Sequence, residues 1–242
     1  MSDLTNPKIL NFLSVLKFNI SKEPFIIDIG TGRGDFVSHC RHGGLGVHGT
    51  IGHYEVFEPI DYNIHDLVKR FASNKVVVNP FAIDLEDGEG TFHLIGNRTP
   101  EDAMSSLHNR PAFANFPRQE ITVKKKRMDT WWSERFPNAT AGIIDLINID
   151  TEGNELRVLQ SFGAILDGNI HARAIQFKYG LCWKDSGASI KDMKALLDNK
   201  GYALFEHLTF EGGRPLNIIE DDYETRTHDV FFAVSKKLWN IK

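Results

Sequence analysis

The sequence has little of several features that would point to particular classes of protein. Its two cysteines, Cys40 and Cys182, have a spacing that suits neither a disulfide framework nor a zinc site. No run of 18 or more apolar residues occurs, so we expect no membrane-spanning helix. The first residues lack a basic segment followed by an apolar core, which predicts no secretory signal. These absences favour a protein of the reducing cytoplasm.

Positive charge is also not in excess over negative charge. The chain has 28 Lys and Arg against 32 Asp and Glu, and a net charge of −4 argues against binding nucleic acid by bulk electrostatics. A local basic patch is compatible with this balance. No internal repeat, low-complexity tract or linker divides the chain. With 242 residues, 41% of them hydrophobic, we expect one large α/β domain over 1–242, with a helical lead-in over 1–20.

The stretch 25–36 is the most informative part of the sequence. Its first five residues are β-branched and aromatic apart from Asp28, which predicts a buried strand, and the glycines that follow predict a sharp turn into a short helix at 36–40. Gly30, Gly32 and Gly34 would let the backbone approach a ligand closely. The third glycine comes one residue earlier than in the dinucleotide loop G-x-G-x-x-G. Together with Asp28 they predict a cofactor loop; a glycine-rich turn without a ligand is the alternative.

Strand and helix alternate through the first third of the chain. Apolar residues at helical spacing predict helices over 7–17 and 61–73, the second burying Ile64, Leu67, Val68 and Phe71. Short apolar runs predict strands at 54–57 and 76–78. The glycine-rich segment 42–49 predicts a loop near the cofactor. A βαβαβ order with right-handed crossovers gives a parallel, doubly wound half-sheet.

Glu58 ends the second predicted strand, immediately before Pro59. Ligands of open α/β sheets lie at the carboxyl ends of the strands, where an acid can accept hydrogen bonds from both ribose hydroxyls of an adenosine. An ionised carboxylate offers only acceptors, which suits a vicinal diol. We therefore predict a ribose contact for Glu58; a solvated acid beside a turn proline is the alternative.

Residues 84–127 are less regular. Asp87-Gly88 predicts a hairpin turn between Ile83 and a strand at 91–95, and 103–108 has the composition of a polar, exposed loop. The segment 121–123 leads into the basic run 124–127, which we predict to lie on an edge strand. Lysines on an edge strand hinder pairing with another chain. A contact with an anionic substrate or a nucleic acid phosphate is the alternative.

An almost continuous apolar run predicts a buried strand over 143–149, and three acids follow it. Asp150, Glu152 and Glu155 would gather where the ligand should lie. The helix that follows has Leu156, Leu159 and Phe162 in its predicted buried stripe. Its dipole favours acids at its N-terminus, and this is a sufficient explanation for the presence of Glu152 and Glu155. Asp150 stands at the strand tip beside the cofactor loop, so it is the first candidate for a catalytic residue.

Residues 150–159, Asp-Thr-Glu-Gly-Asn-Glu-Leu-Arg-Val-Leu, resemble the hallmark of the FkbM-type methyltransferases. These are S-adenosylmethionine-dependent enzymes best known for methylating hydroxyl groups. The resemblance covers most of the chain, and the order and spacing of its pieces are more specific than any single piece. The other pieces are Asp28-Ile29-Gly30 with Gly34, Phe57-Glu58-Pro59, Ala82-Ile83 with Asp87-Gly88, Ser105-Ser106-Leu107 and Met128-Asp129-Thr130-Trp131.

Two positions depart from the family pattern. The family usually has a lysine where this chain has Asn148, and an acid in the fifth strand, where this chain reads Ile-Gln-Phe-Lys-Tyr-Gly over 175–180 with Lys178. An ion pair between these positions cannot exist here in the same form. This bears on substrate identity more than on cofactor binding, and it leaves open a member that binds the cofactor without turnover.

The resemblance implies a class I methyltransferase fold and S-adenosylmethionine as cofactor. The fold would be Rossmann-like, with a mostly parallel seven-stranded sheet, helices on both faces and an antiparallel last strand. A predicted helix from Ile190 to Leu197 and predicted strands at 201–205 and 228–234 fit that ending. The implied cofactor-binding residues are Asp28, Gly30, Gly32, Gly34, Glu58, Pro59, Ala82 and Ile83.

The resemblance also implies direct methyl transfer to the hydroxyl of a small-molecule or glycan acceptor; a nucleic acid acceptor is disfavoured. Asp150 is the first candidate for a general base or for orienting the substrate, Glu152 the second, and His48 the third. We see no metal-ligand spacing, although a carboxylate pair could recruit a divalent ion. Two alternatives stay open. One is a nucleotide-dependent oxidoreductase; the other is a binding or scaffold protein with partner surfaces at 124–127 and 220–222.

Overall fold

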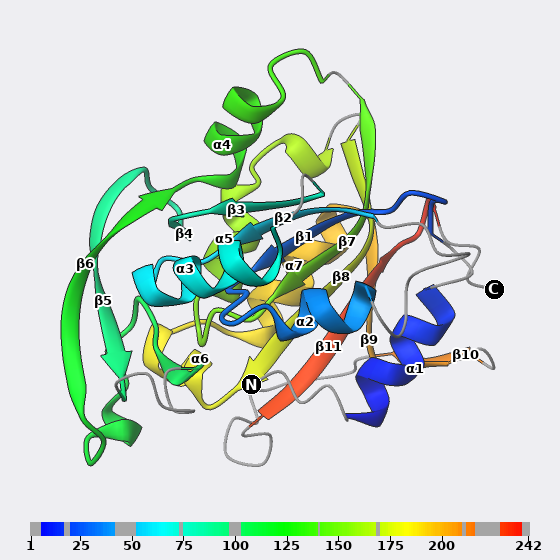
Figure 1. The fold of residues 1–242 in the computed structure, drawn as a ribbon. Helices are drawn as coiled ribbons and strands as arrows, with labels where there is room; N and C mark the ends of the chain where they lie inside the picture. Colours follow the sequence, from blue (N-terminus) through cyan, green and yellow to red (C-terminus); the bar gives the residue numbers. More distant parts are fainter. Residues whose placement is uncertain are drawn as a thin grey trace.

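The computed structural model describes residues 6–16, 20–41, 52–72, 75–96, 103–139, 141–167, 170–209, 212–215 and 228–238. An eight-stranded sheet of order β10-β9-β11-β8-β7-β1-β2-β3 forms its centre (Figure 1). The strands are β1 (Phe25–Ile29), β2 (His53–Phe57), β3 (Val76–Asn79), β7 (Gly142–Ile149), β8 (Ile170–Gly180), β9 (Tyr202–Thr209), β10 (Gly212–Pro215) and β11 (His228–Ser235).

The pairing of these strands confirms the predicted mostly parallel sheet with an antiparallel last strand. Strands β3, β2, β1, β7 and β8 pair in parallel, and β11 lies antiparallel between β8 and β9. The parallel half-sheet that the sequence predicted corresponds to strands β1, β2 and β3 of this sheet. The short strand β10, antiparallel to β9, adds an eighth strand at the edge.

Helices cover both faces of the central sheet. One core contains residues of α1 (Pro7–Leu16), α2 (Asp35–His39) and α3 (Asp61–Arg70); the other contains residues of α4 (Met128–Arg135), α5 (Glu155–Ser161), α6 (Cys182–Ser186) and α7 (Ile190–Asn199). Side chains alternate along a strand, so Ile26 of β1 joins the first core whereas Ile27 and Ile29 join the second. The longest helices of the described residues have ten residues, fewer than a bilayer crossing needs.

The predicted buried faces of the helices are largely confirmed. The apolar residues of α1 at helical spacing, Ile9, Phe12, Leu13 and Leu16, are all buried, and the helix packs on β9 and β11. The buried stripe of α5 is confirmed as well. The prediction for α3 is wrong at Val68, whose side chain is 55% exposed. The predicted Leu67 and Phe71 are buried and Ile64 is half-buried. Asn63 is buried with Leu67 and Phe71, since positions four apart share one side of a helix.

A second, three-stranded sheet of order β4-β6-β5 curves away from the central one (Figure 1). It consists of β4 (Ala82–Ile83), β5 (Gly88–Ile95) and β6 (Arg118–Lys126), and it corrects two expectations. Asp87-Gly88 is not a hairpin turn, because β6 lies between β4 and β5. The basic run does not lie on an edge strand either: Lys125 pairs with Ala82 on one side and Gly88 on the other.

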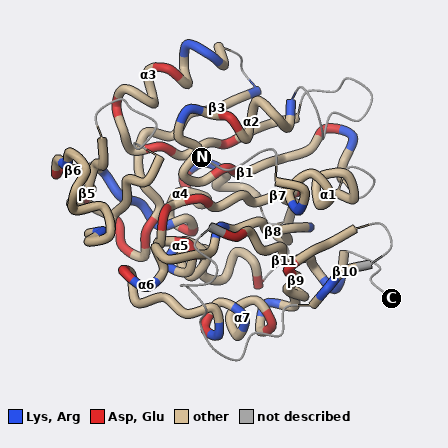
Figure 2. The backbone as a smooth tube through the Cα atoms, turned by 90° about the horizontal axis from the view of Figure 1, so that it is seen from below, with Lys and Arg blue, Asp and Glu red and all other residues tan. Residues whose placement is uncertain are grey.

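The basic run is matched by acids, so edge protection does not explain it. Figure 2 shows basic and acidic positions interspersed along the chain. The ion pairs of the run are Lys125 Nζ to Asp84 Oδ2 at 2.7 Å, Lys126 Nζ to Glu134 Oε2 at 2.5 Å and Arg127 Nη2 to Asp129 Oδ2 at 2.6 Å. The glycine-rich segment 42–49, including His48, and the acids at 220–222 lie outside the described residues.

Candidate functional site

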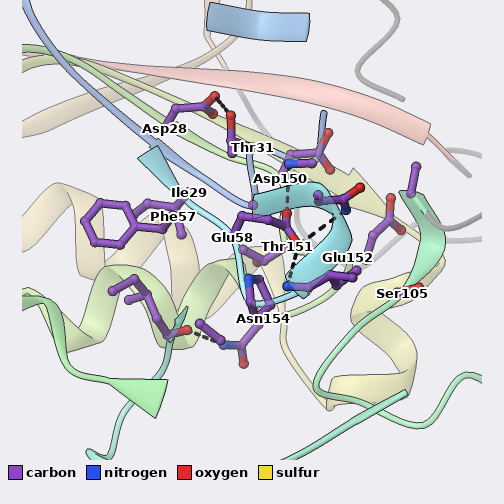
Figure 3. A pocket seen from close by; sticks show the side chains of 18 of the residues that line it. Asp28, Ile29, Thr31, Phe57, Glu58, Ser105, Asp150, Thr151, Glu152 and Asn154 are labelled. Carbon is purple, nitrogen blue, oxygen red and sulfur yellow. Dashed lines mark hydrogen bonds between the residues drawn. The ribbon is translucent and has the colours of Figure 1, made fainter. Parts of the chain in front are cut away.

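A pocket lies at the carboxyl ends of β1, β2 and β7, with β4 and the 103–107 segment on its other side. Figure 3 shows Glu58, Asp150, Thr151 and Glu152 gathered around it. The structure brings together most of the residues that the sequence predicted. The predicted residues that line the pocket are Asp28, Gly30, Gly32, Glu58, Pro59, Ala82, Ile83, Asp150 and Glu152.

The three glycines of the first loop have different surroundings. Their φ angles are 78° for Gly30, 55° for Gly32 and 78° for Gly34, all in the region that side chains disfavour. A Cβ on Gly30 would overlap the carbonyl oxygen of Asp150, whereas no atom lies within 4 Å of a Cβ placed on Gly32. Gly34 does not line the pocket; it precedes α2 and lies against Phe71. Gly32 therefore leaves room beside the pocket, and Gly30 and Gly34 permit close packing.

Glu58 is buried, which rules out the solvated acid beside a proline. Its Oε2 accepts the Gly32 N–H at 2.9 Å, and its Oε1 accepts the Ile60 N–H at 2.9 Å and the Asn63 Nδ2–H at 3.4 Å. Burial raises the pKa of Glu58 to about 7, although these hydrogen bonds oppose the rise. A carboxyl group that titrates near neutral pH in a pocket can change its charge when a ligand binds.

A row of hydrogen-bonded side chains crosses β1, β7 and β8 beside the pocket. Asn148 Nδ2 donates to Asp28 Oδ1 at 2.8 Å, and Gln176 Nε2 donates to Asn148 Oδ1 at 2.9 Å. The three residues are in register on the three strands. Asp28 also accepts from Thr31 Oγ1 at 2.5 Å, and burial raises its pKa to about 6. Uncharged amide groups thus join Asn148 of β7 to Gln176 of β8, whereas the family pattern suggested an ion pair between Asn148 and this segment of β8.

Asp150 and Glu152 belong to a buried charge cluster. Lys178 Nζ lies 3.4 Å from Asp150 Oδ1 and donates to Glu152 Oε1, and Arg110 Nη1 donates to Glu152 Oε2 at 2.6 Å. Burial opposes ionisation of Glu152, but the charges of Lys178 and Arg110 lower its pKa. The side chain of Glu152 is 3% exposed and that of Asp150 is 17% exposed. The helix dipole is therefore not the explanation for Glu152, and Asp150 is the more accessible acid.

Glu155 is the first residue of α5, as expected of an acid near a helix N-terminus, and its side chain hydrogen-bonds the turn before the helix. Its carboxylate accepts the N–H groups of Thr151 and Gly153, each at 2.9 Å, just before α5 begins. Burial raises the pKa of Glu155 to about 7. It does not line the pocket, so two of the three predicted acids reach the ligand space.

The 103–108 segment is not the exposed loop that its composition suggested. Ser105 and Ser106 are buried, and Ser106 forms a bridge with His93 of β5. Ser106 Oγ donates to the carbonyl oxygen of Glu152 at 2.9 Å. Ser105 lines the pocket. Ser105 is therefore part of the wall of the site, and Ser106 supports the neighbouring turn at Glu152.

Several site residues were missed by the sequence reasoning. Arg110 comes from the connection between β5 and β6, and no sequence pattern marked it. Asn154, whose Nδ2 donates to the Ile83 carbonyl oxygen at 3.0 Å, lay inside the hallmark segment and could have been found there. Asn63 and Thr151 also line the pocket. Asn63 Oδ1 and Thr151 Oγ1 are buried without a hydrogen-bond partner among the described residues, so the pocket suits a polar ligand.

Comparisons with known proteins show which sequences and structures this chain resembles. The family model for the methyltransferase FkbM domain matches residues 28–204. A solved methyltransferase FkbM from Methylobacillus flagellatus KT is similar to this chain with a TM-score of 0.50 and 13% identity. The similarity covers 89% of this chain and 44% of that one, so this chain spans less than half of that relative's length.

Two further solved structures are more distant. An rRNA methylase from Streptococcus thermophilus has a TM-score of 0.47 and 10% identity, over 95% of this chain and 97% of that one. A SAM-dependent O-methyltransferase from Thermotoga maritima has a TM-score of 0.44 and 11% identity, over 95% of this chain and 65% of that one. No protein of curated function matches the sequence.

Proposed function

Because the chain belongs to the FkbM methyltransferase family, we propose that it transfers the methyl group of S-adenosylmethionine to a hydroxyl of a small-molecule or glycan acceptor. One observation carries this proposal: a single pocket joins the glycine loop, the buried acid Glu58 and the acids Asp150 and Glu152. The antiparallel strand β11 disfavours a nucleotide-dependent oxidoreductase, whose sheet would continue with parallel crossovers.

The groups that line the pocket fit this cofactor. The Glu58 carboxylate would accept hydrogen bonds from the ribose hydroxyls, and Asn63 Oδ1 is a further free acceptor beside it. Gly32 has no side chain between its backbone and the ligand space. Apolar surface for the adenine would come from Pro59, Ala82 and Ile83. We assign Asp28 to the methionine end of the cofactor, beside the glycine loop.

The chain would contribute mainly positioning and proton acceptance. When bound, the cofactor supplies a methyl group that is activated by a sulfonium and leaves behind a neutral thioether. Holding the acceptor oxygen in line with that group can lower the barrier by roughly 7–11 kcal/mol. Asp150, the more accessible acid, would accept the hydroxyl proton, a contribution of roughly 100- to 10,000-fold. Glu152 has both oxygens engaged by Lys178 and Arg110, so we assign it to holding the site.

The experiment has a binding part and a transfer part. S-adenosylhomocysteine is titrated calorimetrically into the wild type and Asp150→Asn, with Asp129→Asn on α4 as control. Transfer from methyl-labelled S-adenosylmethionine is then measured with hydroxylated small molecules, oligosaccharides and a short RNA. We expect Asp150→Asn to bind within about threefold of the wild type but to transfer at least about 100-fold more slowly.

The other outcomes are equally informative. Equal losses of binding and transfer in Asp150→Asn would make Asp150 a cofactor ligand. Binding by the wild type without transfer to any acceptor would favour the binding or scaffold protein. If the wild type does not bind S-adenosylhomocysteine, the proposed function is wrong.

A further inference from the structure

Lys178 stands where the family resemblance led us to expect an acid, and its ammonium contacts both predicted catalytic carboxylates. It lies at the carboxyl end of β8 and is 9% exposed. Its Nζ is 3.4 Å from Asp150 Oδ1 and donates to Glu152 Oε1. Among the described residues, Lys178 is the cation in ion-pair contact with Asp150.

We propose that Lys178 is a positioning residue for methyl transfer. It holds the Asp150 carboxylate at the pocket and, together with Arg110, engages both oxygens of the Glu152 carboxylate, so that Glu152 does not compete for the acceptor proton. This inference rests on the proposed function, since it assigns a task in the same reaction. The departure from the family pattern at Lys178 then supports methyl transfer instead of abolishing it.

The charge of Lys178 is secure despite its burial. Burial opposes the charged form, but Asp150 and Glu152 together hold the pKa of Lys178 well above its ordinary value. An ammonium has three N–H donors, so it can serve both carboxylates at once. Among the described residues, Asp28 on β1 and Glu155 on α5 are acids that interact unfavourably with the Asp150 carboxylate. Without Lys178, Asp150 would have no ion-pair contact with a cation of the described part of the chain.

The backbone at Glu152 gives independent support. Its φ of 56° makes it the one described residue other than glycine with a positive φ. Such a conformation persists where surrounding contacts determine it, and it is common at functional sites. Here the contacts are Lys178 and Arg110 on the side chain and Ser106 Oγ on the carbonyl oxygen. The turn that carries Asp150 and Glu152 into the pocket is thus held from two sides.

The test compares Lys178→Met and Lys178→Arg with the wild type. The matched control is Lys200→Met, because the Lys200 side chain is 9% exposed, close to the 10% of Lys178, and pairs with Asp167 away from the pocket. Each protein is measured for S-adenosylhomocysteine affinity, thermal unfolding, and kcat and KM with the acceptor that the wild type methylates best.

We expect Lys178→Met to lower kcat about 100-fold, because misplacing a reacting group by about 1 Å has that effect. Its KM and its S-adenosylhomocysteine Kd should stay within about threefold of the wild type, since Lys178 does not line the cofactor pocket. Lys178→Arg keeps the charge and should recover at least about a tenth of the wild-type kcat. Lys200→Met should transfer like the wild type.

Several results would overturn the inference. One is a Lys178→Met protein with wild-type kcat; another is a Lys178→Arg protein no better than Lys178→Met. A wild type that binds S-adenosylhomocysteine but transfers no label also overturns it, because there is then no reaction to support. Failure of the wild type to bind S-adenosylhomocysteine refutes the proposed function itself. If Lys178→Met does not fold, Lys178→Gln replaces it with the same expected result.

Discussion

Glu58→Gln should remove most of the pH dependence of S-adenosylhomocysteine binding between pH 6 and pH 8. In the wild type, burial raises the pKa of Glu58 to about 7, so a large share of the protein carries a protonated Glu58 at neutral pH. Ribose hydroxyls donate best to the ionised carboxylate, which offers only acceptors. Binding therefore selects the ionised form, and the affinity should rise with pH.

The size of the effect follows from that pKa. If the ligand binds only the ionised form, the apparent Kd exceeds the intrinsic Kd by the factor 1 + 10^(pKa − pH). With a pKa of about 7 for Glu58, the factor is about 11 at pH 6 and about 1.1 at pH 8. The wild-type Kd should thus fall about tenfold over this range, or about 1.4 kcal/mol.

The variant should bind weakly and with little pH dependence. Loss of hydrogen bonds to a charged group weakens binding by about 1.5–3 kcal/mol, or roughly 10- to 160-fold at pH 8. Asp28, with a pKa raised to about 6, can add only about a twofold change at pH 6 by the same formula.

The measurement is calorimetric titration at pH 6, 7 and 8, with Glu55→Gln as control. Glu55 is also a buried acid of β2, but it accepts from Asn79 Nδ2 at 2.9 Å and Arg135 Nε at 3.0 Å and does not line the pocket. Its variant should keep the tenfold change. A wild-type Kd that is constant with pH, or a Glu58→Gln protein that keeps the change, would refute the reasoning.

Three further predictions concern the loop, a buried ion pair and metal removal. Gly30→Ala should lower the free energy of unfolding by at least about 2 kcal/mol in denaturant titrations, because its Cβ would overlap the Asp150 carbonyl oxygen. Gly32→Ala should lower it by only about 1–2 kcal/mol, because no atom lies within 4 Å of its Cβ. Gly32→Ala should nevertheless weaken S-adenosylhomocysteine binding. Burial opposes ionisation of Asp84, but its partners Arg157 and Lys125 lower its pKa to about 2. The ionised Asp84 therefore stabilises the fold above about pH 4, and this stability is lost as the pH falls toward 2. Asp84→Asn should therefore cost about 2 kcal/mol at pH 7 and little at pH 2, and an equal cost at both would contradict this. EDTA should leave methyl transfer unchanged, because the Lys178 ammonium occupies the place where a divalent ion would bridge Asp150 and Glu152. A loss of transfer in EDTA that Mg²⁺ restores would contradict this prediction.

The local pattern of the sequence was enough to find the main strands and the order of the fold. Strands β1 and β7 are short apolar runs buried on both faces. The apolar residues that predict each strand therefore lie within the segment itself. The strand-end rule for open α/β sheets then brought Asp28, Glu58 and Asp150 to one edge, and the structure places all three in one pocket. Glycine spacing likewise identified the loop between them.

Pairing between distant segments could not be read in the same way. The turn at Asp87-Gly88 is compatible with a hairpin locally, but β6 inserts between β4 and β5 because burying Ala82, Phe92 and Val123 together needs all three strands. Val68 has the spacing of a core residue, and only the position of α3 against the sheet leaves it exposed.

The charge arrangement of the site was decided by tertiary structure. Arg110 and Lys178 lie 42 and 26 residues from Glu152 in sequence, yet both donate to its carboxylate. The sequence predicted a role for each of the three acids, but it could not show which carboxylate would be paired with cations. Burial makes that distinction, since a carboxylate withdrawn from water needs cations in contact with it, whereas a carboxylate at the edge of a pocket can remain available to a substrate. The motifs therefore determined where the site lies, and packing determined that Asp150 is its more accessible acid.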